Sequence, residues 1–309
     1  MNTAFIVMML LSVIRLSTPT FVAGVGNMFC ERVGVLNLGS EGMMVSGAFC
    51  SVLGSYLTGN AWFGVICGMF GGALAALLHA IVCVEFGGMH AISGLGLNMF
   101  ALGLTTFLCS AIFKSTISPN VAALNTMGWA KDIPVIGLYL AQLSPLVFVA
   151  VAVAVIAYII VFKTPIGMRI RAVGDDPRTV ETAGIDVWKT KYFGVITCGF
   201  ICGLAGSYMA LGQLDRFVIG MTSGKGMLSV IAVKMGRWNP IGIMGTALLL
   251  GFFDALQLQL QFSSGIKIPP ELIQILPFVA GIVVLSLQHS GNDRPSSLEL
   301  PYLRNRYKC

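Results

Sequence analysis

The sequence predicts an all-α protein, a polytopic transmembrane helical bundle of about eight to ten membrane segments, some of them short or broken. Charged residues make up only 10% of the 309 residues, hydrophobic residues make up 56%, and the mean hydropathy is +0.85. So few charges cannot cover the surface of a soluble domain of this size. Residues 61–83 and 143–162 are apolar over about 20 residues, which suits helices and not the roughly ten alternating residues of a barrel strand.

Nine apolar segments are expected along the chain. They are residues 4–29, 41–58, 62–84, 92–113, 143–162, 192–212, 224–234, 240–262 and 271–288. The first contains Pro19, so we expect it to kink or break. The seventh has about eleven residues, too few to cross a core of roughly 30 Å by itself. Residues 38–47 are a second candidate for a segment that enters the membrane without crossing it.

The positions of lysine and arginine predict the orientation of the chain. Six of them lie in residues 163–191 and four in the tail after Gln288. The positive-inside rule places both regions, and hence the C-terminus, in the cytoplasm. We expect a multi-pass protein of the cell (inner or cytoplasmic) membrane, with residues 1–290 as the transmembrane domain and residues 291–309 as a basic cytoplasmic tail. The net charge of +6 follows from this distribution, so nucleic-acid binding is not expected.

No metal site, cofactor or catalytic centre is expected. The eight cysteines form no CxxC pair, and Cys198 and Cys202, one helical turn apart, have no histidine or carboxylate cluster beside them in the sequence. The chain also lacks the GxxxxGK[ST] loop that cradles the phosphates of ATP. We therefore interpret the protein as a membrane component that is not itself an enzyme.

Residues 163–191 form a polar segment between two apolar runs, and ten of them are charged. Asp176 before Pro177 predicts the N-cap and first position of a short helix, and Gly184 predicts its end. A loop that only sets topology needs neither these caps nor the small residues beside them. The segment therefore predicts a docking surface for another protein. Its candidate contact residues are Arg169, Arg171, Ala172, Gly174, Asp175, Asp176, Pro177, Ala183, Gly184 and Ile185.

Polar residues inside the apolar segments form a second candidate set, because intramembrane polar groups are costly and are usually functional. Residues 41–44 (EGMM) and 225–228 (KGML) open two segments in similar ways, which suggests two related halves with a solute site between them. Asn27 and Asn98 have the alternative role of hydrogen bonding between helices, and Glu41 that of capping the second helix. Candidates for a translocation path are Asn27, Asn37, Glu41, Ser93, Asn98 and Asp254.

Four stretches of the chain are recognisable as motifs. They are ERVGVLNLGSEGMMVSGAF (31–49), SGLGLNMFALGLT (93–105), GMRIRAVGDDPRTVETAGID (167–186) and SVIAVKMGRWNPIG (229–242). Together they resemble, over about residues 15–290, the permease subunits of bacterial ATP-binding cassette (ABC) importers. The resemblance is to the nucleoside and simple-sugar branch of the family that also carries branched-chain amino acids. Cys198 and Cys202 depart from the small or aliphatic residues of that branch.

The resemblance implies a pore-forming subunit for a nucleoside or similar small solute, in the lipid bilayer beside a second permease that is homologous or identical. It implies separate ABC ATPase subunits that bind residues 163–191, and an extracytoplasmic solute-binding protein. A simple-sugar (ribose-like) or vitamin permease is the alternative within the family. An ion-coupled secondary transporter would need Glu41 and Asp254 as its acid pair, and would leave the polar segment without a role. A non-transporting scaffold would leave the intramembrane polar residues unexplained.

Overall fold

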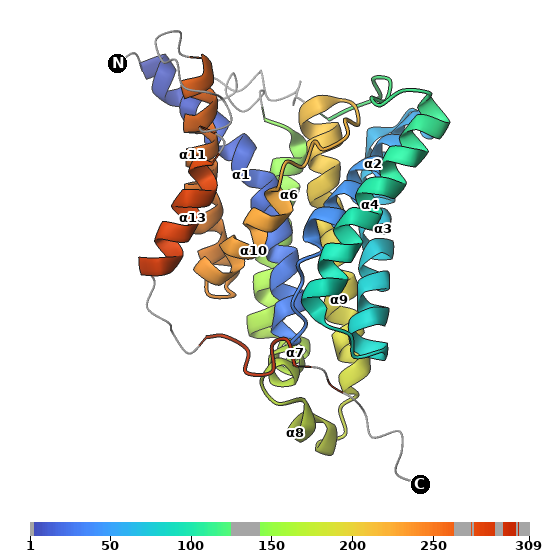
Figure 1. The fold of residues 1–309 in the computed structure, drawn as a ribbon. Coiled ribbons are helices and arrows are strands. Elements are labelled where there is room, and N and C mark those ends of the chain that lie inside the picture. The colour runs from blue at the N-terminus through green and yellow to red at the C-terminus, as the bar shows by residue number, and fades with distance from the viewer. Residues whose placement is uncertain are drawn as a thin grey trace.

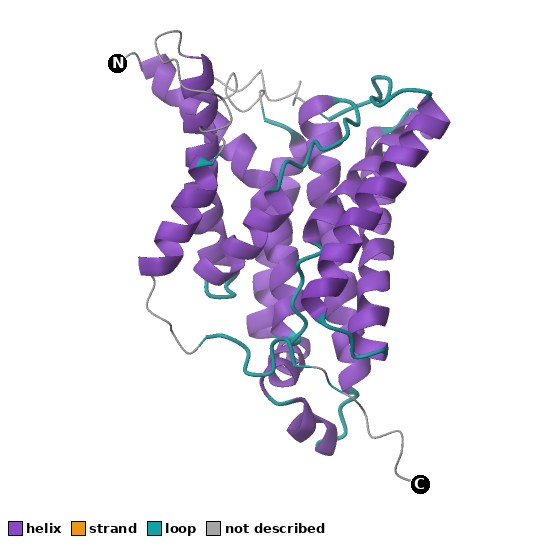
Figure 2. Cartoon of the chain, in the orientation of Figure 1, coloured by secondary structure: helices purple, strands orange, loops and turns teal. Residues whose placement is uncertain are grey.

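The computed structural model describes residues 3–124, 143–262, 273, 275–287, 293–300 and 302. They form a bundle of helices that lie side by side, with two short helices beyond one end of it (Figure 1). Helices dominate the described residues, and loops join them mainly at the two ends of the bundle (Figure 2). Six of the described helices are long and apolar enough to cross a membrane. The prediction of an all-α polytopic bundle is confirmed.

The described helices follow one another in this order. They are α1 (Thr3–Arg32), α2 (Ser40–Thr58), α3 (Ala61–Ala80), the π-helix η1 (Ile81–Glu85), α4 (His90–Phe113), α6 (Pro145–Lys163), α7 (Pro165–Asp175), α8 (Pro177–Thr182), α9 (Val187–Ser207), the π-helix η3 (Tyr208–Leu214), α10 (Lys225–Met235), α11 (Pro240–Phe262) and α13 (Leu276–Leu287). The short seventh segment predicted from the sequence is α10, which has 11 residues. The start of α1 and the pair α7 and α8 lie at opposite ends of the bundle (Figure 1).

The first helix continues past Pro19 and does not break there. A proline at this position cannot donate a hydrogen bond to the carbonyl of Arg15, one turn earlier. Two side chains of η3 donate to that oxygen instead, Tyr208 Oη at 3.2 Å and Gln213 Nε2 at 2.7 Å. Because neighbouring groups satisfy the freed carbonyl, the helix remains intact inside the bundle. The chain leaves helical geometry further on, at residues 33–39.

Helices α3 and α9 pack closely through glycines spaced four residues apart. Gly68 and Gly72 on α3 face Gly199 and Gly203 on α9. A Cβ atom built on Gly199 would lie 2.6 Å from the carbonyl oxygen of Gly72, and one on Gly203 would overlap the carbonyl of Gly68. Apolar side chains gain little by leaving lipid for one another, so close backbone approach is a main source of helix association in a membrane. These glycines therefore build the centre of the bundle.

Candidate functional site

An extended segment, residues 33–39, joins α1 to α2 inside the bundle. Leu36 is only 4% exposed, and both of its backbone polar groups have side-chain partners. Its N–H donates to His90 Nδ1 at 3.3 Å, and its carbonyl oxygen lies 3.2 Å from His79 Nε2. Non-helical backbone at membrane depth is stable only when such partners exist. The two histidines, which the sequence analysis did not single out, supply them here.

The start of α2 is held by side chains of α4. Gly39, the residue before the helix, offers no side-chain cap. Asn98 Oδ1 accepts a hydrogen bond from Gly42 N at 2.8 Å, and Asn98 Nδ2 donates to the carbonyl of Leu38 at 2.8 Å. Ser93 Oγ lies 2.9 Å from Nδ1 of His79 and so fixes the ring that contacts the extended segment. The interhelical hydrogen bonding considered for Asn98 is present.

The start of α10 is held by a side chain of α2. Gly224 precedes the helix with φ +79° and has no side chain to cap it. The carboxylate of Glu41 accepts hydrogen bonds from Gly224 N at 2.9 Å and from Gly226 N at 2.7 Å. A carboxylate is favourable at the positive end of a helix, where N–H groups lack partners. Glu41 thus caps α10, a helix far away in the sequence, instead of capping its own.

Two buried amides connect four elements at the same level of the bundle. Asn27 Nδ2 donates to Ser229 Oγ at 2.7 Å, and Asn37 Nδ2 donates to Asn27 Oδ1 at 2.7 Å. The thiol of Cys198 donates to the same oxygen of Asn27 at 3.3 Å. All four side chains are fully buried. They link α1, the extended segment, α9 and α10, which gives a structural reason for the cysteine that departs from the motif.

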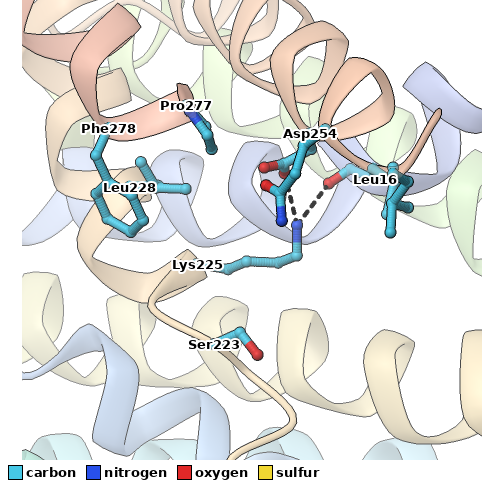
Figure 3. A pocket seen from close by; sticks show the side chains of 9 residues that line it. Leu16, Ser223, Lys225, Leu228, Asp254, Pro277 and Phe278 are labelled. Carbon is cyan, nitrogen blue, oxygen red and sulfur yellow. Dashed lines mark hydrogen bonds and ion pairs between the residues drawn. The ribbon is translucent and has the colours of Figure 1, made fainter. Parts of the chain in front are cut away.

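An ion pair lies beside the start of α10 (Figure 3). Lys225 Nζ is 2.8 Å from Asp254 Oδ2 of α11, and the two side chains are only 12% and 13% exposed. The ammonium also contacts the carbonyl of Leu16 on α1 at 3.4 Å. The pair borders a cavity of about 280 Å³. Asp254 is thus largely enclosed, and its partner Lys225 was not among the residues singled out from the sequence.

The six predicted path residues gather around one region. Asn37 belongs to the extended segment, Asn27 and Asn98 contact that segment directly, and Ser93 contacts it through His79. Asn27, Glu41 and Asp254 contact the start of α10. The region is where α2 and α10 both begin inside the bundle. The backbone changes direction there, and side chains of other helices, Asn98 and Glu41, accept hydrogen bonds from backbone N–H groups at both helix starts.

The polar segment, residues 163–191, contains two helices and three side-chain caps. Asp176 Oδ1 accepts hydrogen bonds from Arg178 N at 3.1 Å and Thr179 N at 3.3 Å and so caps α8, as predicted. Hydrogen bonds from the side chain and backbone of Thr179 hold the pKa of Asp176 below its ordinary value, so the cap keeps its charge. Gly184 ends the helix region with φ +82°, as predicted. Helix α7, which precedes α8, was not predicted from the sequence.

The ten candidate docking residues differ in exposure. Five are exposed, namely Arg169, Asp175, Asp176, Ala183 and Gly184. Gly174 is buried against the carbonyl oxygen of Arg32 at the end of α1, where a Cβ atom would overlap that oxygen. Its own carbonyl accepts hydrogen bonds from Ser297 N at 2.9 Å and Ser297 Oγ at 2.6 Å. The remaining four are half-buried, namely Arg171, Ala172, Pro177 and Ile185. The basic residues Arg304, Arg306 and Lys308 of the predicted tail lie outside the described residues.

The end of α1 connects the polar segment to the turn between α10 and α11. The guanidinium carbons of Arg32 and Arg171 lie 5.9 and 5.5 Å from the ring centre of Phe162. Arg32 Nη2 donates to the carbonyl of Trp238 at 3.1 Å, and Trp238 Nε1 donates to Glu31 Oε2 at 2.6 Å. Trp238 has φ +51°, a conformation that a bulky residue keeps only when its surroundings hold it. These contacts connect α7, through the end of α1, to the turn that follows α10.

Comparison with known proteins places these features in a family. The profile described as "Branched-chain amino acid transport system / permease component" matches residues 9–285. The guanosine ABC transporter permease protein NupQ of Bacillus subtilis is 33% identical and covers 94% of this chain and 94% of its own. The nucleoside ABC transporter permease protein NupC of Lactococcus lactis is 34% identical, with 94% and 95% covered. A Haloferax volcanii relative named for glucose transport is 32% identical, with 88% and 89% covered.

Proposed function

The chain belongs to the family of branched-chain amino acid transport system permease components, and we propose that, as a permease subunit of an ABC importer, it carries a nucleoside. Two relatives named for guanosine and nucleoside transport carry this proposal, since each covers 94% of this chain. The relative named for glucose makes a simple sugar the second candidate. Six helices among the described residues are long and apolar enough to span a membrane, which agrees with a multi-pass subunit.

The polar segment is, in this proposal, the cytoplasmic surface that separate ATPase subunits bind. Helix α8 is short, is capped at its start by Asp176 and is followed by Gly184, so it presents a fixed shape. Helix α8 lies beyond the end of the bundle (Figure 1), and most of its residues are exposed. The positive charge of this segment supports a cytoplasmic position for it and for the C-terminus. A second permease and an extracytoplasmic binding protein complete the importer.

Closure of the ATPases would reach the translocation path through α1 and α10. Helix α7 contacts Arg32, and Arg32 holds the carbonyl of Trp238 directly after α10. The opposite end of α10 is held by Glu41 of α2. A shift of α7 would thus move α10 relative to α2, and the region where both helices begin would change its shape. Such rigid-body coupling needs no ATP site in this chain.

The described contacts also disfavour an ion-coupled secondary transporter. Such a carrier would use Glu41 and Asp254 as an acid pair that binds and releases ions or protons. Asp254 already has an ammonium partner at 2.8 Å, and Glu41 accepts two backbone N–H groups. To take up an ion, each carboxylate would have to give up these contacts. The two residues therefore suit a fixed electrostatic role better than the carriage of ions.

Solute uptake by cells distinguishes the two solute candidates. A host strain that lacks its own uptake of guanosine, uridine and glucose would express the complete importer with and without this chain. We expect labelled guanosine and uridine to accumulate only when this chain is present, and glucose to remain outside. Accumulation of glucose alone would overturn the nucleoside assignment and support the sugar permease.

Cross-linking tests the docking surface separately. In a background without native cysteines, Ala183→Cys places a thiol on the exposed end of α8. We expect a bifunctional thiol reagent to join it to an ATPase subunit that carries cysteines around its permease-facing groove. Gly103→Cys on α4 is the matched control, because this exposed position has no neighbouring atom within 4 Å and lies within an apolar helix. Equal cross-linking at both positions would exclude α8 as the docking element.

A further inference from the structure

The cavity beside the start of α10 has the features of a solute site. It lies between α1, α10, α11 and α13 and has a volume of about 280 Å³. We propose that this cavity holds the transported solute inside this chain, that Lys225 and Asp254 hydrogen-bond its polar groups, and that Phe278 contacts its ring. The inference rests on the proposed function and deepens it, because it names the residues that recognise a neutral, ring-bearing solute.

The ion pair is the first observation that supports the site. A buried ion pair adds little stability, because the cost of removing both charges from water offsets their attraction, and apolar residues of similar volume often replace it without loss. The fold therefore does not require Lys225 and Asp254 at 12% and 13% exposure. The ammonium has three donors and the carboxylate has four acceptor positions. Hydrogen bonds to Asp254 and to the carbonyl of Leu16 leave capacity on both groups for a solute.

The lining of the cavity is the second observation, since it is polar on one side and apolar on the other. The polar groups are those of Lys225, Asp254, Gln257 and Ser223, and the apolar residues are Leu16, Leu228, Leu258, Pro277 and Phe278. Figure 3 shows Lys225 and Asp254 pointing toward each other, with Phe278 and Leu228 close together nearby. Ligand pockets combine an apolar wall with a few polar groups in this way and start at roughly 300 Å³.

The chemistry of this lining selects the class of solute. The opposite charges of Lys225 and Asp254 cancel, so the site does not favour a solute with net charge. Hydroxyl groups both donate and accept hydrogen bonds, and so they fit an ammonium beside a carboxylate. An aromatic base fits the apolar wall, because stacking on an aromatic side chain such as Phe278 is favourable for every base. A nucleoside carries both kinds of group in one molecule.

The position of the cavity connects binding to movement. Lys225 is the first residue of α10. A Cβ atom built on Gly224, the residue before it, would lie 3.2 Å from the ring of Phe278. The N–H of the same Gly224 donates to Glu41. A solute held by Lys225 and Phe278 therefore contacts the point at which α10 is anchored to α2. Binding and release would act on the helix that we propose to move during transport.

Photolabelling of the assembled importer in lipid nanodiscs, without its binding protein, tests the site. The probe is an azido-substituted adenosine, and the labelled peptides are mapped after irradiation. We expect the label on α10 or α13, and we expect guanosine to compete with it. Phe278→Ala should reduce labelling about tenfold, as the loss of a stacking contact predicts. Phe252→Ala is the matched control, because Phe252 is 42% exposed on the outer face of α11 and should leave the labelling unchanged.

A charge exchange separates recognition from structure. The double variant Lys225→Asp with Asp254→Lys keeps an ion pair but reverses its position in the cavity. We expect it to assemble with the ATPases and to lose labelling at least about tenfold, as does Asp254→Asn. Phe278→Leu keeps an apolar side chain but removes the ring. It should also reduce labelling, and so it provides a second test if Phe278→Ala fails to assemble. Normal labelling in the charge exchange, or in both Phe278 variants, would show that the cavity is only a packing feature.

The results also separate this inference from the nucleoside assignment. Label that is absent from the chain, or that lies on other helices, overturns the cavity as the solute site even when cells take up guanosine. Label in the cavity that glucose displaces and guanosine does not would support the site while overturning the nucleoside assignment. Label in the cavity that guanosine displaces supports both.

Discussion

Replacement of Glu41 should weaken the anchorage of α10 by an amount that the structure predicts. The carboxylate accepts two backbone N–H groups, at 2.9 and 2.7 Å. Hydrogen bonds to charged groups contribute about 1.5–3 kcal/mol each, and an unpaired buried donor costs about 1–3 kcal/mol. Glu41→Gln keeps one acceptor oxygen but turns an amide donor toward the second N–H group. We expect it to lower the free energy of unfolding by about 2 kcal/mol, and Glu41→Ala by about 3–5 kcal/mol.

Close packing supports these magnitudes. A Cβ atom built on Gly226 would lie 2.5 Å from the Cα of Glu41, so the start of α10 and the start of α2 are in backbone contact. Water has little room to replace the carboxylate at this contact. Glu41→Asp should also destabilise, since its side chain is one carbon shorter and cannot reach both N–H groups at ideal distance. The carboxylate thus contributes by its length as well as by its charge.

Titration with a denaturant in a mild detergent, with the loss of tertiary structure as the signal, measures the free energy of unfolding of these variants. Asp215→Asn is the matched control, because its carboxylate pairs with Arg216 at half-exposed positions and such surface pairs contribute about 0–1 kcal/mol. Transport by Glu41→Gln should also become slower, because the start of α10 loses one of its two hydrogen bonds to residue 41. A stability of Glu41→Gln within about 0.5 kcal/mol of the unchanged protein would refute the capping of α10 by this carboxylate.

Four further predictions concern the helix packing and the docking segment. Gly72→Val should abolish folded protein, because its side chain would overlap α9, whereas Gly103→Val should accumulate normally in membranes; equal yields of the two would contradict the close approach of α3 and α9. Ala183→Trp should insert normally but fail to co-purify with the ATPases, and normal co-purification and transport would exclude this exposed residue from the docking surface. Asp176→Ala should reduce ATP-driven uptake more than Asp176→Asn, which keeps a capping oxygen, and equal rates would show that the cap has no part in coupling. The pKa of Asp176 lies below the ordinary value of an aspartate, so its carboxylate is charged at every pH above that ordinary value. Its stabilising effect is lost only when the pH falls through the lowered pKa. ATPase binding should therefore stay constant between about pH 5 and 8.

Local signals in the sequence predicted the polar segment well. The N-cap at Asp176, the first position at Pro177 and the left-handed Gly184 all involve residues within a few positions of one another. Such signals do not depend on the rest of the fold. The short α10 was predictable for the same reason, since its length follows directly from where its apolar run begins and ends.

Contacts between distant residues were not predictable in this way. Glu41 was singled out, yet its partners Gly224 and Gly226 belong to a helix that only the three-dimensional arrangement places beside it. Gly174 was interpreted as part of a docking surface because it is small, whereas its size is required by contact with Arg32 inside the chain. Cys198 was noticed as a rejected metal ligand and as a departure from a motif, and its contact with Asn27 was not foreseen. The sequence indicates that these three residues are unusual, and their contacts in the fold explain why each residue type is needed.

ATP-dependent uptake into proteoliposomes tests the central claim most directly. Vesicles would contain this chain with its second permease and ATPases, the binding protein would be added with labelled guanosine, and ATP would be supplied on the side of the ATPases. We expect uptake that requires ATP and every component, and none by this chain alone under a proton or sodium gradient. Gradient-driven uptake of guanosine by this chain alone would contradict its role as an ABC permease subunit.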